Sequence, residues 1–169
     1  MIDIDYSSDD FIMKSVNKEE IPYVQEWFNY NLTENTINAS PIGIEEFFES
    51  FCASYISKDE YYMKVYDKNR KKFLGIVKGR IESENLHISL LMIDKEEQGL
   101  GVGSKVINEL VRYFKEKVSI VNIITGIMAD INNISIFWEK NGFKEYKRIK
   151  EYFELNGQSY DGILFKYTL

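Results

Sequence analysis

The chain has 169 residues, a length typical of one domain, and its 44% of hydrophobic residues can fill a complete core. Its 21 basic and 27 acidic side chains give a net charge of −6, which argues against a general DNA- or RNA-binding protein, because such proteins present basic surfaces. The single cysteine, Cys52, and single histidine, His87, exclude an internal disulfide and a structural zinc site, so we expect no metal.

The chain begins with a predicted strand and two predicted helices. Residues 11–16 form the strand, and Asn17 caps the first helix, with Glu20 completing a capping box. Pro41 opens the second helix, whose apolar stripe we assign to the core. The stripe consists of Ile44, Phe47, Phe48, Phe51 and Tyr55.

The rest of the chain alternates between predicted strands and helices. In chain order these are strands at 61–66, 73–81 and 86–93, a helix at 101–117, a strand at 120–128, a helix from Asn132 or Asn133 to Asn141, and strands at 143–155 and 160–169. The basic turn at 68–72 is interpreted as a solvated loop rather than a nucleic-acid site, because no aromatic platform accompanies it. This order predicts a single α/β domain with a mixed sheet.

Three glycines at alternate positions lie between the apolar strand and the amphipathic helix, in the segment Gln98-Gly99-Leu100-Gly101-Val102-Gly103-Ser104. Glycine removes the Cβ that would block a ligand, and backbone N–H groups at a helix N-terminus favour an anion. The segment therefore predicts a pyrophosphate cradle. It matches neither the Walker motif nor the dinucleotide motif, because no Lys-Ser/Thr pair follows the last glycine and position 104 is not glycine.

A second informative segment contains Asn132 and Asn133 and ends in Trp138-x-x-x-Gly142-Phe143. With the glycine segment, in this order of elements, it resembles the GNAT superfamily of acyl-CoA-dependent N-acyltransferases. That family's signatures are Gln/Arg-x-x-Gly-x-Gly/Ala after the fourth strand and an Asn-containing helix ending in aromatic-x-x-x-Gly-Phe. The likeness covers residues 10–169 and includes the late hairpin with Tyr160-Asp161-Gly162.

The resemblance implies one domain over residues 1–169, with a mixed, largely antiparallel sheet, about four flanking helices and a V-shaped splay between the fourth and fifth predicted strands. It implies that the coenzyme A pyrophosphate is held by backbone amides of Gln98, Gly99, Leu100, Gly101, Val102, Gly103 and Ser104. The pantetheine arm would pair along the fourth strand near Leu91, Met92 and Ile93, where a backbone N–H would polarise the thioester carbonyl. Asn132 or Asn133 would hydrogen-bond the arm.

Trp138 stands where many members of the family have a tyrosine that protonates the leaving thiolate. An indole N–H does not act as a general acid at physiological pH, so we interpret Trp138 as packing beside the thioester. Tyr146, Tyr152 or water remain alternatives for the proton donor.

Transfer to an amine also requires that the amine be neutral. His87, near the start of the fourth strand, has the pKa range of a general base. Strand alternation places it on one face with Ser89 and Leu91 unless a bulge interrupts the strand. Glu82 and Glu84 are alternative bases acting through water. A purely structural role for His87 stays open.

The resemblance implies an N-acetyltransferase that moves the acetyl group of acetyl-CoA directly to a primary amine in a ternary complex. The lack of a cysteine pair favours a reducing, cytoplasmic location. The acceptor is a small molecule, a peptide N-terminus or a lysine, and the net charge mildly favours a cationic one. The alternative is a non-catalytic acyl-CoA-binding or regulatory module. We expect no nucleic-acid partner because of the negative net charge. We expect no membrane partner because no stretch approaches the ~18 apolar residues of a membrane span. A homodimer is one alternative for the oligomeric state.

Overall fold

The protein is built around one eight-stranded mixed sheet with helices on both faces. The computed structural model describes residues 1–32, 40–117, 119–129, 132–155 and 157–169. The strands are β1 (Asp5–Ser7), β2 (Phe11–Ser15), β3 (Glu60–Asp67), β4 (Phe73–Glu82), β5 (Asn85–Ile93), β6 (Asn122–Met128), β7 (Lys144–Leu155) and β8 (Gln158–Thr168), in the sheet order β1-β2-β3-β4-β5-β6-β8-β7. The helices are α1 (Ile21–Tyr30), α2 (Ile44–Ile56), α3 (Val102–Lys117) and α4 (Asn132–Lys140), with a 3₁₀ turn (Lys18–Glu20) before α1.

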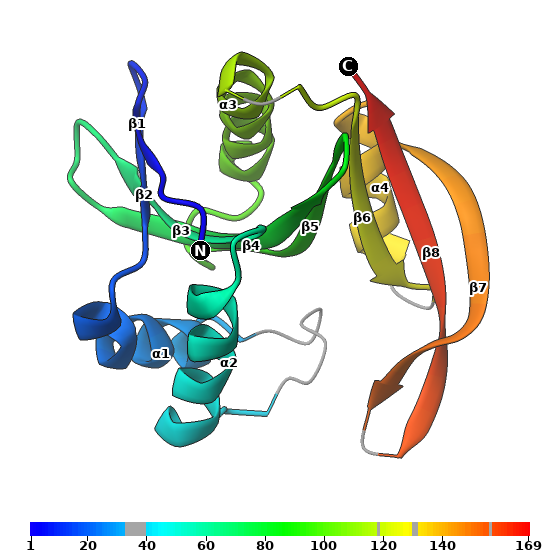
Figure 1. The fold of residues 1–169 in the computed structure, drawn as a ribbon, viewed down its shortest axis with the longest axis horizontal. Coiled ribbons are helices and arrows are strands. Elements are labelled where there is room, and N and C mark those ends of the chain that lie inside the picture. Colours follow the sequence, from blue (N-terminus) through cyan, green and yellow to red (C-terminus); the bar gives the residue numbers. More distant parts are fainter. Residues whose placement is uncertain (33–39, 118, 130–131, 156) are drawn as a thin grey trace.

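The central feature of the sheet is a parting between β5 and β6. These two strands are parallel and pair from Asn85–Ile88 to Asn122–Thr125. β5 then continues to Ile93 and β6 to Met128 without pairing further with each other. Figure 1 shows the two strands diverging from their paired end. The predicted mixed, largely antiparallel sheet and its V-shaped splay are therefore confirmed.

The two faces of the sheet carry separate cores. On one face, α3 and α4 pack with Leu86, Ile88 and Ile93 of β5. On the other, α1 and α2 pack with Tyr62 and with Met92. Residues of one strand that point to opposite faces are thus directed either toward α3 or toward α2.

The N-terminal region differs from the prediction in three respects. The short strand β1 was not predicted, and α2 begins at Ile44 after the N-cap Gly43, not at Pro41. The stripe of α2 assigned to the core is only half buried: Phe47 and Phe51 are buried, whereas the exposed fraction is 45% for Ile44, 45% for Phe48 and 54% for Tyr55. α2 lies at the outer edge of its layer (Figure 1), so one row of its apolar residues faces solvent. Among the described residues, no helix has the length and apolarity to cross a membrane.

Candidate active site

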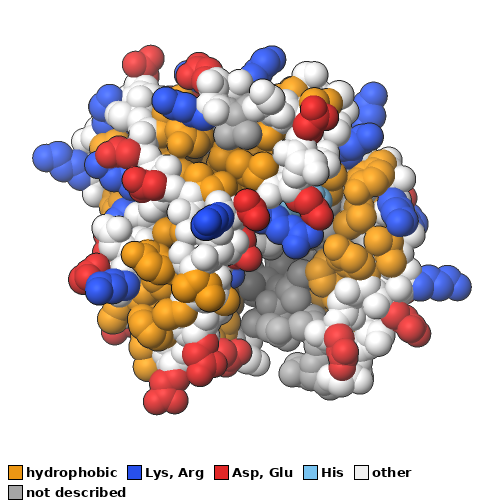
Figure 2. Space-filling model, in the orientation of Figure 1, with side chains coloured by type: hydrophobic (Ala, Val, Ile, Leu, Met, Phe, Trp, Pro, Cys, Tyr) orange, Lys and Arg blue, Asp and Glu red, His pale blue; other side chains and the backbone are white. Residues whose placement is uncertain are grey.

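A cavity of about 510 Å³ lies where β5 and β6 separate. Strands β3, β4 and β5 form one wall, and the β7–β8 hairpin forms the opposite wall. The polar side chains of the lining include those of Glu60, Lys78, Arg80, His87, Tyr146 and Tyr152. Figure 2 shows acidic and basic side chains side by side at the centre of this face of the molecule.

A β-bulge in β5 changes the direction of its side chains within the site. Lys78 pairs with Leu90 and Gly79 with Ile88, so Ser89 is the extra residue. Its hydroxyl donates to the carbonyl of Lys78 at 3.1 Å. Before the bulge His87 points away from the α3 core; after it, Leu90 shares that direction, whereas Leu91 packs into the α3 core. The expectation that His87 and Leu91 share a face was therefore wrong, because strict alternation does not cross a bulge.

The splay leaves backbone groups of β5 free on the side that β6 has left. The amide of Asp94 donates to the carbonyl of Leu74, so Asp94 belongs to the residues of this strand that hydrogen-bond to β4. In an antiparallel pair every second residue does so, which makes Met92 the next one. The backbone N–H and C=O groups of Leu91 and Ile93 therefore point away from β4, toward the gap. The side-chain amide of Gln98 donates to the Ile93 carbonyl at 2.9 Å. The N–H groups of Leu91 and Ile93 are thus directed into the space between the strands.

The glycine segment lies at the end of this gap, immediately before α3. Gly99 and Gly101 have φ of +76° and +80°, and a Cβ built on either would meet nothing within 4 Å. Lys105 donates to the carbonyl of Gly101 as the first hydrogen bond of α3, so the N–H groups of Val102, Gly103 and Ser104 have no partner within the helix. The segment thus presents open space beside unpaired helix N–H groups, which is the geometry of an anion site. These residues fit the pyrophosphate of coenzyme A.

The loop before the glycines is tied to the β3–β4 turn by a charged cluster. The side chain of Glu97 is 8% exposed and accepts hydrogen bonds from Arg70 Nη1 and Nη2 at 2.8 and 2.9 Å and from Lys72 Nζ at 3.1 Å. Hydrogen bonds from Arg70 and then Lys72 lower the pKa of Glu97 to about 2. Interpreting the basic turn as solvated missed this role, since nothing in the sequence connects residues 27 positions apart.

The Arg70→Met variant tests this tie. We expect a lower Tm at neutral pH and weaker binding of acetyl-CoA, because the loop loses its anchor and the Glu97 carboxylate keeps fewer partners. The folded-state pKa of Glu97 is depressed from 4.5, so its contribution to stability is complete above that value and is lost as the pH falls toward about 2. In melting curves followed by circular dichroism, the Tm gap between wild type and Arg70→Met should narrow over that range. A gap independent of pH would contradict the assignment.

His87 lies at the wall of the cavity, partly shielded from solvent. Burial, and then the Arg80 charge, lower the pKa of His87 below 6.5, while Glu82 opposes them in part. Its Nε2 is 3.6 Å from a carboxylate oxygen of Glu82. The imidazole is therefore neutral at neutral pH and able to accept a proton. Glu84 lies exposed in the turn between β4 and β5, outside the cavity lining.

The helix α4 contributes packing at the base of the splay. Trp138 is buried and makes edge-to-face contacts with Phe137 at 5.1 Å and Phe143 at 4.8 Å between ring centroids. A Cβ on Gly103 would lie 3.2 Å from the Phe137 ring, so α3 and α4 approach closely there. Asn133 is exposed in the first turn of α4, and the side chain of Asn132 lies outside the described residues.

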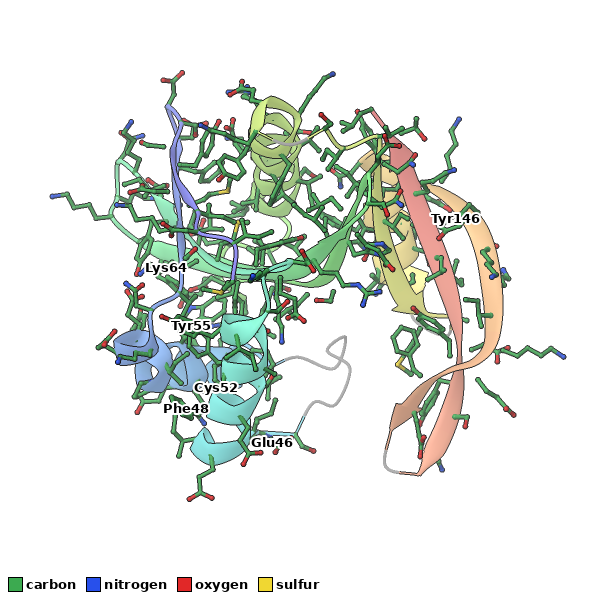
Figure 3. The ribbon with its side chains drawn as sticks, in the orientation of Figure 1. Glu46, Phe48, Cys52, Tyr55, Lys64 and Tyr146 are labelled. Carbon is green, nitrogen blue, oxygen red and sulfur yellow. The ribbon has the colours of Figure 1, made fainter. Side chains whose placement is uncertain are left out.

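Two tyrosines from the late hairpin face the cavity. Tyr146 and Tyr152 both line it, and Figure 3 shows Tyr146 on β7. Burial, and then the proximity of Tyr152, raise the pKa of Tyr146, which keeps its hydroxyl protonated at neutral pH. A Cβ on Gly162 would lie 2.6 Å from the ring of Tyr152, so this glycine is required for the tyrosine to lie across β8. The β7 register shift that positions Tyr152 leaves no simple sequence pattern.

Comparisons with known proteins support a shared fold. An acetyltransferase from Salmonella typhimurium that modifies the N-terminal serine of the 50S ribosomal subunit protein L7/L12 aligns with a TM-score of 0.82 and 15% identity over 96% of both chains. RimL, a ribosomal L7/L12 alpha-N-protein acetyltransferase solved with coenzyme A, gives 0.80 and 14% over 96% of both chains. A chimera of the spermidine N-acetyltransferase SpeG from Vibrio cholerae and hSSAT gives 0.79 and 18% over 95% of this chain and 96% of the other.

A search of curated protein sequences finds no match. The profile of one family, described as an acetyltransferase (GNAT) domain, matches residues 13–164, nearly the whole chain. The match spans both the glycine segment and the α4 segment that carry the resemblance noted from the sequence. The chain therefore belongs to the GNAT acetyltransferase family.

Proposed function

We propose that the protein is an N-acetyltransferase that moves the acetyl group of acetyl-CoA directly to a primary amine in a ternary complex. The observation that carries this proposal is the cavity at the splay, where the imidazole of His87 faces a space open to the gap between β5 and β6. The structural neighbours that acetylate a polyamine or a peptide N-terminus are consistent with an amine acceptor.

Acetyl-CoA is the co-substrate in this proposal and supplies the thioester. The backbone of residues 98–104 holds its pyrophosphate, as the open space beside Gly99 and Gly101 allows. The N–H groups of Leu91 and Ile93, directed into the gap, are the donors available to an oxyanion. The resemblance implied a contact with Met92 as well. Its backbone N–H points toward β4, and its side chain packs in the core between the sheet and helices α1 and α2, so we assign no donor to it.

His87 takes the role of general base in the proposal. Its lowered pKa suits the removal of a proton from an ammonium group, directly or through water. Tyr146 and Tyr152 are the described phenol hydroxyls in the cavity lining, and in the proposal they return a proton to the leaving thiolate. Trp138 takes no proton-transfer role, because it is packed between aromatic rings.

The alternative, a non-catalytic acyl-CoA-binding module, is not favoured. Such a module needs the glycine segment but has no use for a cavity lined by a neutral imidazole and two phenol hydroxyls. A cytoplasmic location and a homodimer stay predictions from the sequence.

Two measurements test the proposed function. Acetyl-CoA at 100 times its Kd should stabilise the protein by about 2.7 kcal/mol, which raises the Tm of a chain of this size by about 5–10 °C. A panel of primary amines with acetyl-CoA should then release free thiol. The absence of both a Tm shift and calorimetric binding would overturn the cradle, whereas binding without thiol release from any amine would favour the non-catalytic alternative.

A further inference from the structure

Basic side chains dominate the wall of the cavity formed by β4. Arg80 lies directly across from Glu60 on β3 and from His87 on β5. Lys78 comes two residues earlier on β4 and therefore points to the same face of the sheet. Lys78 and Arg80 bring two cations to a lining that, as far as the structure describes it, includes one carboxylate, Glu60.

The two cations differ in their partners. Arg80 Nη2 lies 3.1 Å from Glu82 in a solvent-exposed pair. Lys78 Nζ donates to the hydroxyl of Ser50 on α2 at 3.3 Å and lies 5.7 Å from the ring centroid of Tyr62. No salt bridge of Lys78 is formed with any described residue.

Lys78 is therefore a half-buried cation in the cavity wall that has no carboxylate partner among the described residues. Its ammonium has three donors and one neutral acceptor within hydrogen-bond distance. Burial lowers its pKa, and Glu60 counteracts this effect in part. Removing an ammonium from water is costly unless an anion or further acceptors replace the water. An anionic group of a bound ligand would satisfy this position.

We propose that Lys78 binds an anionic group of the acceptor, which is then a primary amine carrying a carboxylate near the amine. This inference rests on the proposed function, because it assigns the ligand of the same cavity. Lys78 and His87 come from the adjacent strands β4 and β5 and line the same cavity, so one small ligand can present its anionic group to the first and its amine to the second. Amino acids and acidic peptide N-termini share this chemistry.

The local charge reverses the expectation drawn from the whole chain. A net charge of −6 mildly favoured a cationic acceptor. A polyamine in this cavity would instead place positive charge against Lys78 and Arg80, which is repulsive. The cavity of this chain thus favours an acceptor other than spermidine, the substrate in the name of the structural neighbour SpeG.

Paired acceptors test the proposal. β-Alanine is compared with β-alaninamide, and an amidated peptide with Asp at its second position is compared with the same peptide carrying Asn there; spermidine is a third arm. Free thiol is measured at saturating acetyl-CoA. We expect the acid member of one pair to have a KM about 10- to 100-fold lower than its neutral partner, because a hydrogen bond to a charged group has this strength. If the β-alanine pair shows the difference in KM, the acceptor is an amino acid; if the peptide pair shows it, the acceptor is a peptide N-terminus.

Substitutions then connect the discrimination to Lys78. Lys78→Met should raise the KM of the acid member about 10- to 100-fold and leave that of the neutral member unchanged, whereas Lys78→Arg should retain the preference. Lys14→Met is the matched control, since Lys14 lies on β2 in an exposed pair with Asp5, away from the cavity. Tm values check that each variant is folded.

Equal use of acid and neutral amines by the wild type overturns the proposal, as does a Lys78→Met variant that weakens both members alike. The wild-type comparison decides the matter if Lys78→Met does not fold. If acetyl-CoA binds but no amine reacts, the proposed function fails separately. Calorimetry with β-alanine and β-alaninamide then decides the anion site: tighter binding of the acid supports it, and equal binding overturns it.

Discussion

In the Gly101→Val variant we expect acetyl-CoA binding to fall by at least about 100-fold. The Cβ of residue 101 would extend into the open space beside the first turn of α3, where the N–H groups of Val102 and Gly103 have no partner within the helix and can bind an anion. A branched side chain there would displace the pyrophosphate from those donors. Losing two hydrogen bonds to a charged group costs about 3–6 kcal/mol, which corresponds to 100-fold or more in Kd. Calorimetry with acetyl-CoA measures the change directly.

The same substitution also strains the backbone, so a control is needed. Gly101 has a φ of +80°, a region that costs a β-branched residue about 1–3 kcal/mol. Gly157, at the β7–β8 turn, has a φ of +74° and equally open surroundings. Gly157→Val should therefore show a similar fall in Tm with normal affinity for acetyl-CoA. Normal affinity in a folded Gly101→Val variant would instead mean that the glycines only start the helix.

The framework of this fold could be predicted from the sequence because the strongest patterns are local. The apolar run of β5 reflects burial on both faces of the sheet, and the 3–4 spacing of Val106, Ile107 and Leu110 reflects burial of one face of α3 against it. Gly99 and Gly101 are required by backbone angles that other residues disfavour. β1 was missed because three residues of mixed polarity, Asp5–Ser7, show no periodicity.

The cavity depends on non-local features, which is why its chemistry was predicted only in part. The place of His87 near the start of β5 follows from the sequence, but the bulge at Ser89 that sets its neighbours depends on pairing with β4. The link between Arg70 and Glu97 and the cation of Lys78 depend on which strands become adjacent in the sheet. Charge summed over the chain says little about one wall of one cavity, as the two cations beside His87 demonstrate.

For His87→Gln we expect turnover to fall by roughly 10²–10⁴-fold, the usual contribution of general acid–base catalysis, with little change in acetyl-CoA affinity. Because the folded-state pKa of His87 lies below 6.5, the neutral base is lost only as the pH falls through that lowered value. The wild-type profile of kcat/KM should therefore have an acidic limb with its midpoint below 6.5, and the variant should lack it. Raising the pH should partly rescue the variant, since more of the amine then arrives neutral.

The neighbours of His87 supply the sharper test, because they move its pKa in opposite directions. Arg80→Gln removes the charge that opposes the imidazolium, so the pKa should rise and the acidic limb should move to higher pH. Glu82→Gln removes the carboxylate that favours the imidazolium, so the limb should move to lower pH. A structural histidine would leave the limb in place in both variants. That result, or normal turnover in His87→Gln, would remove His87 from the chemistry and transfer the role of base to Glu82 acting through water, because Glu84 lies outside the cavity lining. The transferase assignment would then stand on acetyl-CoA binding and thiol release.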